Sequence, residues 1–199
     1  MTTPDDTTKN SMQLYSRTNK RLYLNATERD LFFKACKKQP LERRVFALTL
    51  FYTGCRLSEA RALTPAALQF QEQILSIRSL KKRDQHHVRE IPIPPDLSLL
   101  LRQMSAKTSE NALYWRVDRV TAYRWIKNVM TGAGLEGPQA CPKGLRHSFG
   151  VHAIQNGIQL DLLRRWMGHA SLETTAIYTR VMELEEIELA KRMWHGSAS

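Results

Sequence analysis

The sequence has few cysteines and no long apolar run. Its three cysteines, Cys36, Cys55 and Cys141, are far apart and form no C-x-x-C pair, so neither a disulfide framework nor a zinc site is indicated. No apolar stretch approaches the roughly 18 residues that a membrane-spanning helix needs. Met1 to Asn10 are polar and lack the apolar core of a secretory signal. These absences indicate a cytoplasmic protein with reduced thiols and no membrane partner.

Acidic residues are also scarce relative to basic ones. Nineteen Asp and Glu face thirty Lys and Arg in 199 residues, which leaves a formal net charge of +11. This excess favours a polyanionic partner such as nucleic acid, although membranes and acidic proteins also bind basic patches. Apolar residues make up 42% and charged residues 25%, which is typical of a folded domain and not of a disordered chain. Internal repeats and low-complexity blocks are absent.

Apolar periodicity predicts a mainly α protein with a small antiparallel β-sheet, in the α+β class. Residues 1–25 show no sustained periodicity, and we expect a flexible tail there. Thr27 is the expected cap of the first helix, with Asp30 in the capping-box position. Strands are expected at 74–77 and 88–93, joined as a hairpin by a basic loop at 80–87. Further helices are expected at 41–52, 57–63, 96–107, 119–131, 146–156, 159–167, 172–178 and 183–194.

A glycine turn forms the first of three segments suited to holding an anion. Gly54 places Arg56 near the start of a helix, where backbone N–H groups already favour negative charge. Glu59 follows three residues later, close enough to brace the guanidinium group. Taken alone, this pattern is more typical of an ordinary capped helix with a surface ion pair.

Two later segments carry further candidate groups. Lys143 and Arg146 are three residues apart at a helix start, so both can point at one phosphate. His147 points elsewhere at that spacing, and we expect it to be structural. In the third segment His169 precedes a helix, and Tyr178 comes nine residues after it. A lone histidine or tyrosine is usually a packing or surface residue, so neither segment is specific by itself.

Taken together and in order, the three segments resemble the catalytic domain of the tyrosine recombinases, the phage-integrase family. That family carries a TGxRxSEL-like turn, then an HxLRHxF-like segment, then GHxxxxxTxxY. The matching runs are TGCRLSEA at 53–60, KGLRHSF at 143–149 and GHASLETTAIY at 168–178. The resemblance spans about residues 25–195 and implies the family's catalytic-domain fold over 26–182.

The resemblance implies a site-specific recombinase that cleaves and rejoins DNA through a 3′-phosphotyrosine. Arg56 and Arg146 would hold the non-bridging oxygens of the scissile phosphate, a planar bidentate task that suits arginine. His169 would hydrogen-bond the same phosphate, and Tyr178 would attack phosphorus. Double-stranded DNA is then the expected partner.

The proton-transfer roles of two lysine positions are left open by the family's pattern. The second motif usually begins with histidine, whereas this chain has Lys143 there. Lysine, with an ordinary pKa of about 10.4, is a poor base at neutral pH, so proton transfer at this position stays open. A hairpin lysine would protonate the leaving 5′ oxygen. Lys81 and Lys82 would point to opposite faces of a strand, and we expect Lys81 to be the acid because it follows the first strand in the family's register.

No cofactor or metal is expected, because fixed cations can stabilise the phosphate charge and no acidic cluster suited to two Mg²⁺ ions is apparent. The resemblance also implies a homo-oligomer, with four subunits on two DNA sites, and is compatible with an accessory DNA-binding protein. Residues 183–199 would pack on their own domain or dock on a neighbouring protomer.

Other functions share part of this pattern. A non-catalytic DNA-binding regulator on the same fold would keep the basic surface but would not need the nucleophile Tyr178. A type IB topoisomerase would keep the chemistry and only relax DNA, but the small size and the motif spacing favour a recombinase. About 25 residues precede the first expected helix, too few for the DNA-clamping domain of typical members. The chain is therefore a truncated form or a naturally short recombinase like the fimbrial-switch invertases, and Met1 and the tail favour the latter.

Overall fold

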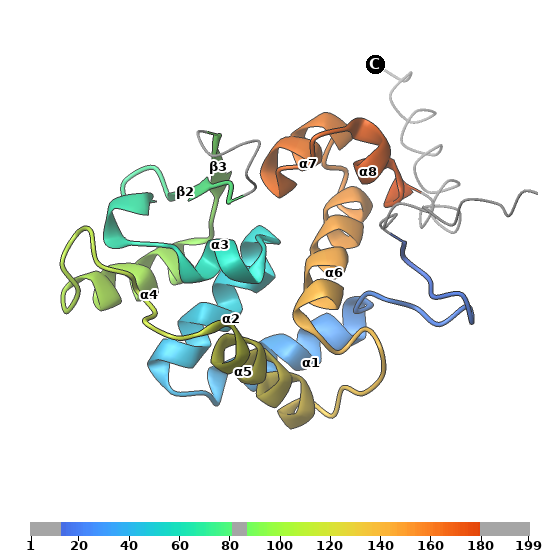
Figure 1. The fold of residues 1–199 in the computed structure, drawn as a ribbon, viewed down its shortest axis with the longest axis horizontal. Coiled ribbons are helices and arrows are strands. Elements are labelled where there is room, and N and C mark those ends of the chain that lie inside the picture. The colour runs from blue at the N-terminus through green and yellow to red at the C-terminus, as the bar shows by residue number, and fades with distance from the viewer. Residues whose placement is uncertain (1–12, 81–86, 180–199) are drawn as a thin grey trace, which may run out of the picture.

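The structure is a computed structural model that describes residues 13–80 and 87–179 (Figure 1). Helices dominate the described part, and three short strands form one sheet. In chain order the elements are α1 (Ala26–Lys37), α2 (Leu41–Thr53), α3 (Leu57–Arg61), the 3-10 helix η1 (Pro65–Ala67), β1 (Leu68–Gln69), β2 (Ile74–Arg78), β3 (Val88–Pro92), α4 (Pro95–Ser105), α5 (Arg119–Gly132), α6 (Pro142–Gln155), α7 (Leu160–Met167) and α8 (Leu172–Ala176). The predicted fold class, mainly α with a small antiparallel sheet, is confirmed.

The sheet is antiparallel with strand order β1-β2-β3. Leu75 of β2 pairs with Ile91 of β3, and Ile77 pairs with Arg89. These four side chains point inward and are buried, as strand alternation requires. The two-residue strand β1 was not predicted, because so short a segment leaves no alternation to detect. An arginine at an inward position is unusual, since a buried charge needs a partner.

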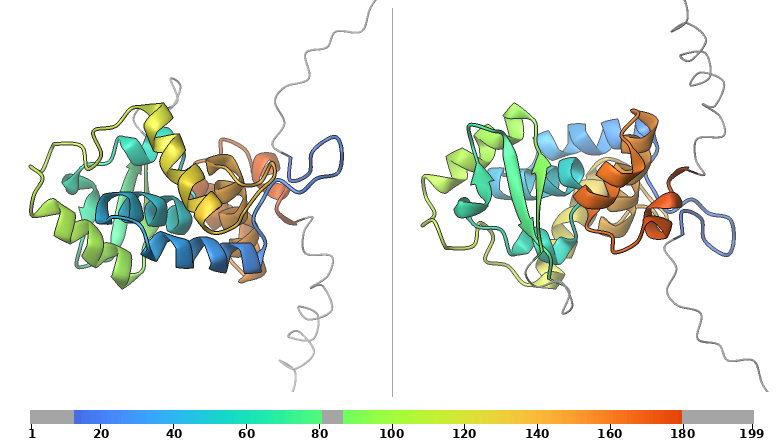
Figure 2. Two further views of the ribbon diagram at one scale, coloured as in Figure 1. Left: turned by 90° about the horizontal axis from the view of Figure 1, so that it is seen from below. Right: turned by 90° about the horizontal axis from the view of Figure 1, so that it is seen from above.

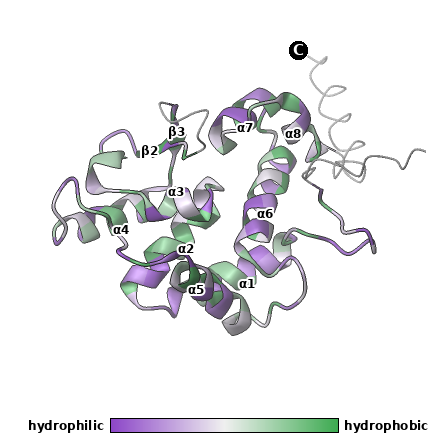
Figure 3. Ribbon diagram, viewed as in Figure 1, coloured by the Kyte–Doolittle hydropathy of each residue, from purple (hydrophilic) through white to green (hydrophobic). Residues whose placement is uncertain are grey.

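Helix α2 is the centre of the main core. It contacts α1, α3, α4, α5 and α6, and Figure 3 shows it largely in the hydrophobic colour. The ring of Phe46 packs edge-on against Trp115 and Trp125, with centroids 5.1 and 5.7 Å apart. Such pairs fix ring positions beyond simple burial. The turn at Gly54 that ends α2 therefore starts from a rigid support.

A second apolar cluster joins α6, α7 and the segment that follows α8, and Figure 1 and Figure 2 show these elements close together, with α7 next to strand β3. It includes Leu163, Met167 and Tyr178, and also Leu14 and Tyr23 from the N-terminal segment. The expected flexible tail is therefore wrong for residues 13–25, where isolated apolar side chains pack without a regular element. Residues 1–12 lie outside the described residues.

Two predicted helix starts need correction. The N-cap of α1 is Asn25, and Glu28 completes the capping box, so the prediction of Thr27 with Asp30 was wrong. Asparagine is an equally good cap, and Glu28 can reach back to the Asn25 N–H. Helix α6 begins at Pro142, one turn before the predicted start at 146, because proline is well suited to a first helical position.

The remaining predicted elements match within a few residues. Helix α8 ends at Ala176, so Tyr178 lies just beyond the helix that was predicted to contain it. The predicted helix at 183–194 lies outside the described residues.

Two glycines give a matched test of the packing around Tyr178. A Cβ on Gly150 would lie 2.6 Å from atoms of the Tyr178 ring, whereas a Cβ on Gly132 would meet nothing within 4 Å. We expect Gly150→Ala to lower the free energy of unfolding by about 1–3 kcal/mol through overpacking. Gly132→Ala should raise it by up to about 1 kcal/mol through helix propensity. Urea denaturation measures both, and equal effects would contradict the close packing.

Candidate active site

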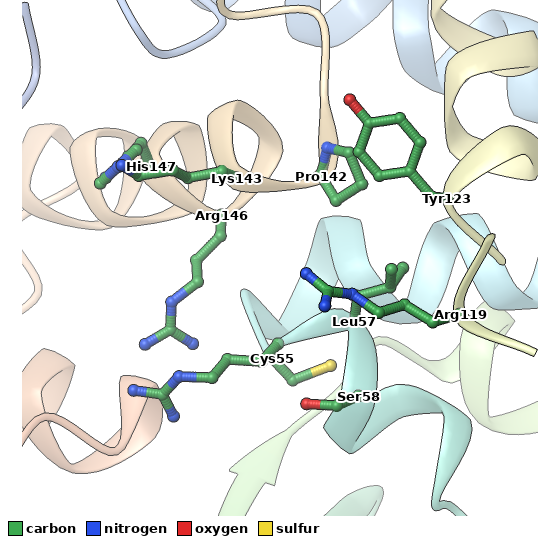
Figure 4. A pocket seen from close by; sticks show the side chains of 10 residues that line it. Cys55, Leu57, Ser58, Arg119, Tyr123, Pro142, Lys143, Arg146 and His147 are labelled. Carbon is green, nitrogen blue, oxygen red and sulfur yellow. The ribbon is translucent and has the colours of Figure 1, made fainter.

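A cavity of about 600 Å³ lies between the starts of α3, α5 and α6 (Figure 4). It is lined by Cys55, Arg56, Leu57, Ser58, Arg119, Tyr123, Pro142, Lys143, Arg146 and His147. Four of these residues are lysine or arginine, and no carboxylate is among them. In Figure 4 the side chains of Arg146 and Arg119 reach into this space from different helices. The cavity is therefore suited to an anion.

Arg146 is fixed from behind by two turns. Its guanidinium group donates to the Gly54 carbonyl at 2.6 Å and to the Met167 carbonyl at 2.7 Å. Burial, with the nearby charge of Arg56, lowers the pKa of Arg146 to about 10, so the side chain is still a cation at neutral pH. Only 7% of the residue is exposed. The result is a preorganised positive charge whose orientation does not depend on a ligand.

Arg56 caps helix α3 and is braced by Glu59, as the spacing predicted. Its backbone N–H donates to Glu59 Oε2 at 2.7 Å, and its Nη1 donates to Oε1 at 2.8 Å. Its Nη2 also lies 3.4 Å from the Gly168 carbonyl oxygen. The side chain is 27% exposed, which leaves part of the guanidinium group open to the cavity.

Arg89 belongs to the same cluster and was missed from the sequence. Its Nη2 donates to Glu59 Oε2 at 2.5 Å, and its Nε donates to the Trp166 carbonyl at 2.7 Å. Burial alone would raise the pKa of Glu59, but the charge and hydrogen bonds of Arg89, together with Arg56, hold it below its ordinary value. The available signal was the inward register of Arg89 in the strand predicted at 88–93.

His169 is held in the turn between α7 and α8. Gly168, at φ 61°, ends α7 in the left-handed region that favours glycine. The Nδ1 of His169 lies 2.9 Å from Thr175 Oγ1. Its ring stacks on that of Tyr178 at 6.3 Å between centroids, with 13° between the planes. The last motif thus folds back so that its histidine and tyrosine are in contact.

The Tyr178 hydroxyl is hydrogen-bonded to the His147 ring. The residue is 0% exposed, and its Oη lies 3.1 Å from His147 Nδ1. Burial raises the pKa of Tyr178 above its ordinary value, although Arg146 and Arg56 oppose the shift. The hydroxyl is therefore protonated at neutral pH. The His147 ring, expected to be structural, contacts both Tyr178 and the cavity.

The candidate residues fall into three groups. Arg56, Lys143 and Arg146 line one cavity, and His169 packs with Tyr178 beside it. Lys81 and Lys82 lie outside the described residues. The residues that flank their loop, Ser79 and His87, line a neighbouring hollow that His169 also lines. The base of the predicted hairpin is thus next to the candidate site.

The described residues show neither a metal site nor a membrane-spanning helix. No group of three His, Cys, Asp or Glu residues there is arranged to hold a metal ion. No helix in residues 13–80 and 87–179 is long and apolar enough to cross a membrane.

The buried His147 ring predicts a pH dependence of stability. Burial, with the charges of Lys143 and Arg146, lowers its pKa from 6.5 to about 4. The unfolded chain therefore binds the proton first, and the free energy of unfolding falls as the pH drops through 6.5 toward 4.

We expect the wild type to lose about 2 kcal/mol more than His147→Gln between pH 7 and pH 5. Denaturant unfolding at both pH values measures this difference. Parallel pH profiles for the two proteins would show that His147 is not held neutral by the fold.

Comparison with known proteins identifies relatives over most of the chain. The curated tyrosine recombinase XerA of Pyrococcus furiosus is 31% identical over 154 residues, which cover 72% of this chain and 52% of that protein. Tyrosine recombinase XerD of Brucella abortus biovar 1 is 30% identical over 148 residues, covering 68% of this chain and 47% of that protein. The chain thus spans about half the length of these curated relatives.

Solved structures share the fold. A crystal structure of XerA recombinase superposes with a TM-score of 0.72 at 24% identity, over 86% of this chain and 64% of that one. The catalytic domain of bacteriophage HP1 integrase gives 0.59 at 21% identity, over 82% of this chain and 90% of that one. The predicted catalytic-domain fold is confirmed. The model of the phage integrase family also matches residues 22–185, and the chain therefore belongs to the phage integrase family.

Proposed function

We propose that this chain is the catalytic domain of a site-specific tyrosine recombinase, which cleaves and rejoins DNA strands through a 3′-phosphotyrosine. One observation carries the proposal. Arg56 and Arg146, from segments about 90 residues apart, converge on a single basic cavity. The phenol ring of Tyr178 packs against Gly150 of α6, and its hydroxyl is hydrogen-bonded to His147, which lines the same cavity. Two fixed cations and an adjacent hydroxyl are what transfer of a phosphodiester to tyrosine requires.

In this proposal Arg56 and Arg146 bind the two non-bridging oxygens of the scissile phosphate. Both guanidinium groups are already held in place, Arg146 by two backbone carbonyls and Arg56 by Glu59, so little reorganisation is needed as charge develops on phosphorus. His169 donates a further hydrogen bond to the phosphate. Its orientation is set by Thr175 on the opposite ring nitrogen.

Cleavage exchanges one phosphoester for another. The Tyr178 Oη–P bond forms while the bond from phosphorus to the 5′ oxygen breaks, the phenol proton leaves to a base, and an acid protonates the 5′ oxygen. Because one phosphoester replaces another, the free 5′ hydroxyl can reverse the step without ATP. In the structure the Tyr178 hydroxyl is hydrogen-bonded to His147, so attack requires this hydroxyl to turn toward the arginines.

Two lysines are proposed for the proton transfers. Lys143 lines the cavity in the first turn of α6 and occupies the family's usual histidine position. Lys81, on the hairpin loop, is proposed as the acid that protonates the 5′ oxygen, with Lys82 as the alternative. No metal or other cofactor takes part in this scheme.

Double-stranded DNA is the proposed partner. The net charge of +11 supports it, and among the fold neighbours a XerH recombinase is bound to its difH substrate. We also propose a cytoplasmic homo-oligomer, a tetramer on two DNA sites, in which residues 183–199 dock on a neighbouring protomer. A non-catalytic regulator is the alternative function, but it would have no use for a tyrosine packed beside paired arginines.

The proposed chemistry can be tested with a pool of nicked suicide duplexes of varied sequence. We expect a covalent protein–DNA adduct on a denaturing gel, because the nick releases a short strand and traps the phosphotyrosine. Tyr178→Phe should abolish the adduct. Tyr15→Phe, at an exposed tyrosine, is the control and should retain it. DNA binding by the wild type without any adduct would support the regulator instead.

The acid can be identified with a duplex whose 5′ bridging oxygen at the cleaved bond is replaced by sulfur. A thiolate leaves without protonation, so only the loss of the acid is bypassed. We expect Lys81→Ala to slow cleavage of the oxygen substrate by about 100-fold and to cleave the sulfur substrate at nearly the wild-type rate. Lys82→Ala is the matched comparison. Rescue of Lys82→Ala in place of Lys81→Ala would reassign the acid, and rescue of Lys143→Ala would place it on α6.

A further inference from the structure

Glu59 is a buried carboxylate with two arginine partners. Its side chain is 1% exposed, that of Arg89 is 3% exposed, and that of Arg56 is 27% exposed. Arg89 approaches with both terminal nitrogens, at 2.5 Å to Oε2 and 3.3 Å to Oε1. Arg56 takes the same carboxylate from the cavity side, with Nη1 at 2.8 Å from Oε1. One negative charge thus lies between an inner and an outer positive charge.

The charge balance of this triad bears on what Arg56 can bind. A carboxylate paired with Arg56 alone would largely cancel its charge, and in a buried setting that attraction is poorly screened. Arg89 provides a second positive charge, which leaves the triad with a net charge of +1. Because Arg89 is buried, the surplus is available only at Arg56, on the open side.

Arg89 also contacts the turn that carries His169. Its Nε donates to the Trp166 carbonyl. The next two carbonyls along the chain, of Met167 and Gly168, accept from Arg146 and Arg56. A Cβ on Gly168 would lie 3.1 Å from Arg89 Nη1, so the backbone of the turn rests closely on the Arg89 guanidinium group. Three arginines therefore bind three consecutive carbonyls at the end of α7.

We propose that Arg89 is a positioning residue of the candidate site. It neutralises Glu59, so that Arg56 keeps its positive charge for an anion. It also supports the backbone of the turn that carries His169. The identity of the anion as a DNA phosphate rests on the proposed function. The charge argument itself needs only a phosphate group.

The test uses the full chain, with inorganic phosphate as the probe. Phosphate is titrated while the arginine side-chain Nε–H signals are followed by ¹⁵N NMR, and the Arg56 signal is assigned with Arg56→Lys. We expect Arg89→Met to weaken phosphate binding at Arg56 by about tenfold or more, because the carboxylate of Glu59 then largely neutralises the charge of Arg56. Arg102→Met, at an exposed arginine of α4 packed over Phe70, should bind phosphate as the wild type does.

Two further variants separate charge from packing. Arg89→Lys keeps a cation beside Glu59, so its phosphate affinity should stay within about threefold of the wild type. Arg89→Met with Glu59→Gln removes both charges and should recover most of the affinity lost in Arg89→Met. A purely structural role of Arg89 gives no reason for that recovery.

Several results would overturn the proposal. Phosphate affinity of Arg89→Met within twofold of the wild type is one, and failure of the double variant to recover affinity is another. Where Arg89→Met does not fold, Arg89→Lys decides alone, since a tenfold loss there contradicts the charge argument. Absence of a DNA adduct with the wild type would remove the proposed function but leave the phosphate titration valid.

Discussion

The arrangement of the whole site depends on the Arg146 guanidinium group and the two carbonyls that it joins. Gly54 and Met167 belong to turns that end two helices, and each offers a carbonyl that the helix no longer uses. A buried cation that satisfies both ties α2, α6 and α7 together at one point. The turn carrying Arg56 and the turn carrying His169 are thereby fixed relative to each other.

The sequence predicted candidate residues for the site but few of their mutual contacts. Arg56, Arg146, His169 and Tyr178 are predicted from three ordered motifs, and the bracing of Arg56 by Glu59, predicted from helical spacing, is confirmed. Contacts across elements could not be predicted in this way.

Arg89 lies 30 residues from Glu59 along the chain, and only the folded sheet brings the two together. Its inward register in β3 was nonetheless visible in the predicted strand. His147 was expected to be structural because its helical spacing from Arg146 points it away from the phosphate. In the structure this direction brings its ring to the Tyr178 hydroxyl. The order within residues 13–25 was missed for a related reason, since Leu14 and Tyr23 pack singly and leave no periodic pattern.

The buried position of Tyr178 implies an energetic cost for moving the ring. The ring fills a space bounded by Gly150, which has no side chain to take its place, and by the rings of His147 and His169. Moving an aromatic ring out of such a packed site leaves a cavity, at a cost on the order of 3 kcal/mol. In a recombinase, contacts with DNA would have to compensate that cost, so Tyr178 would keep this buried position while the protein is free of DNA.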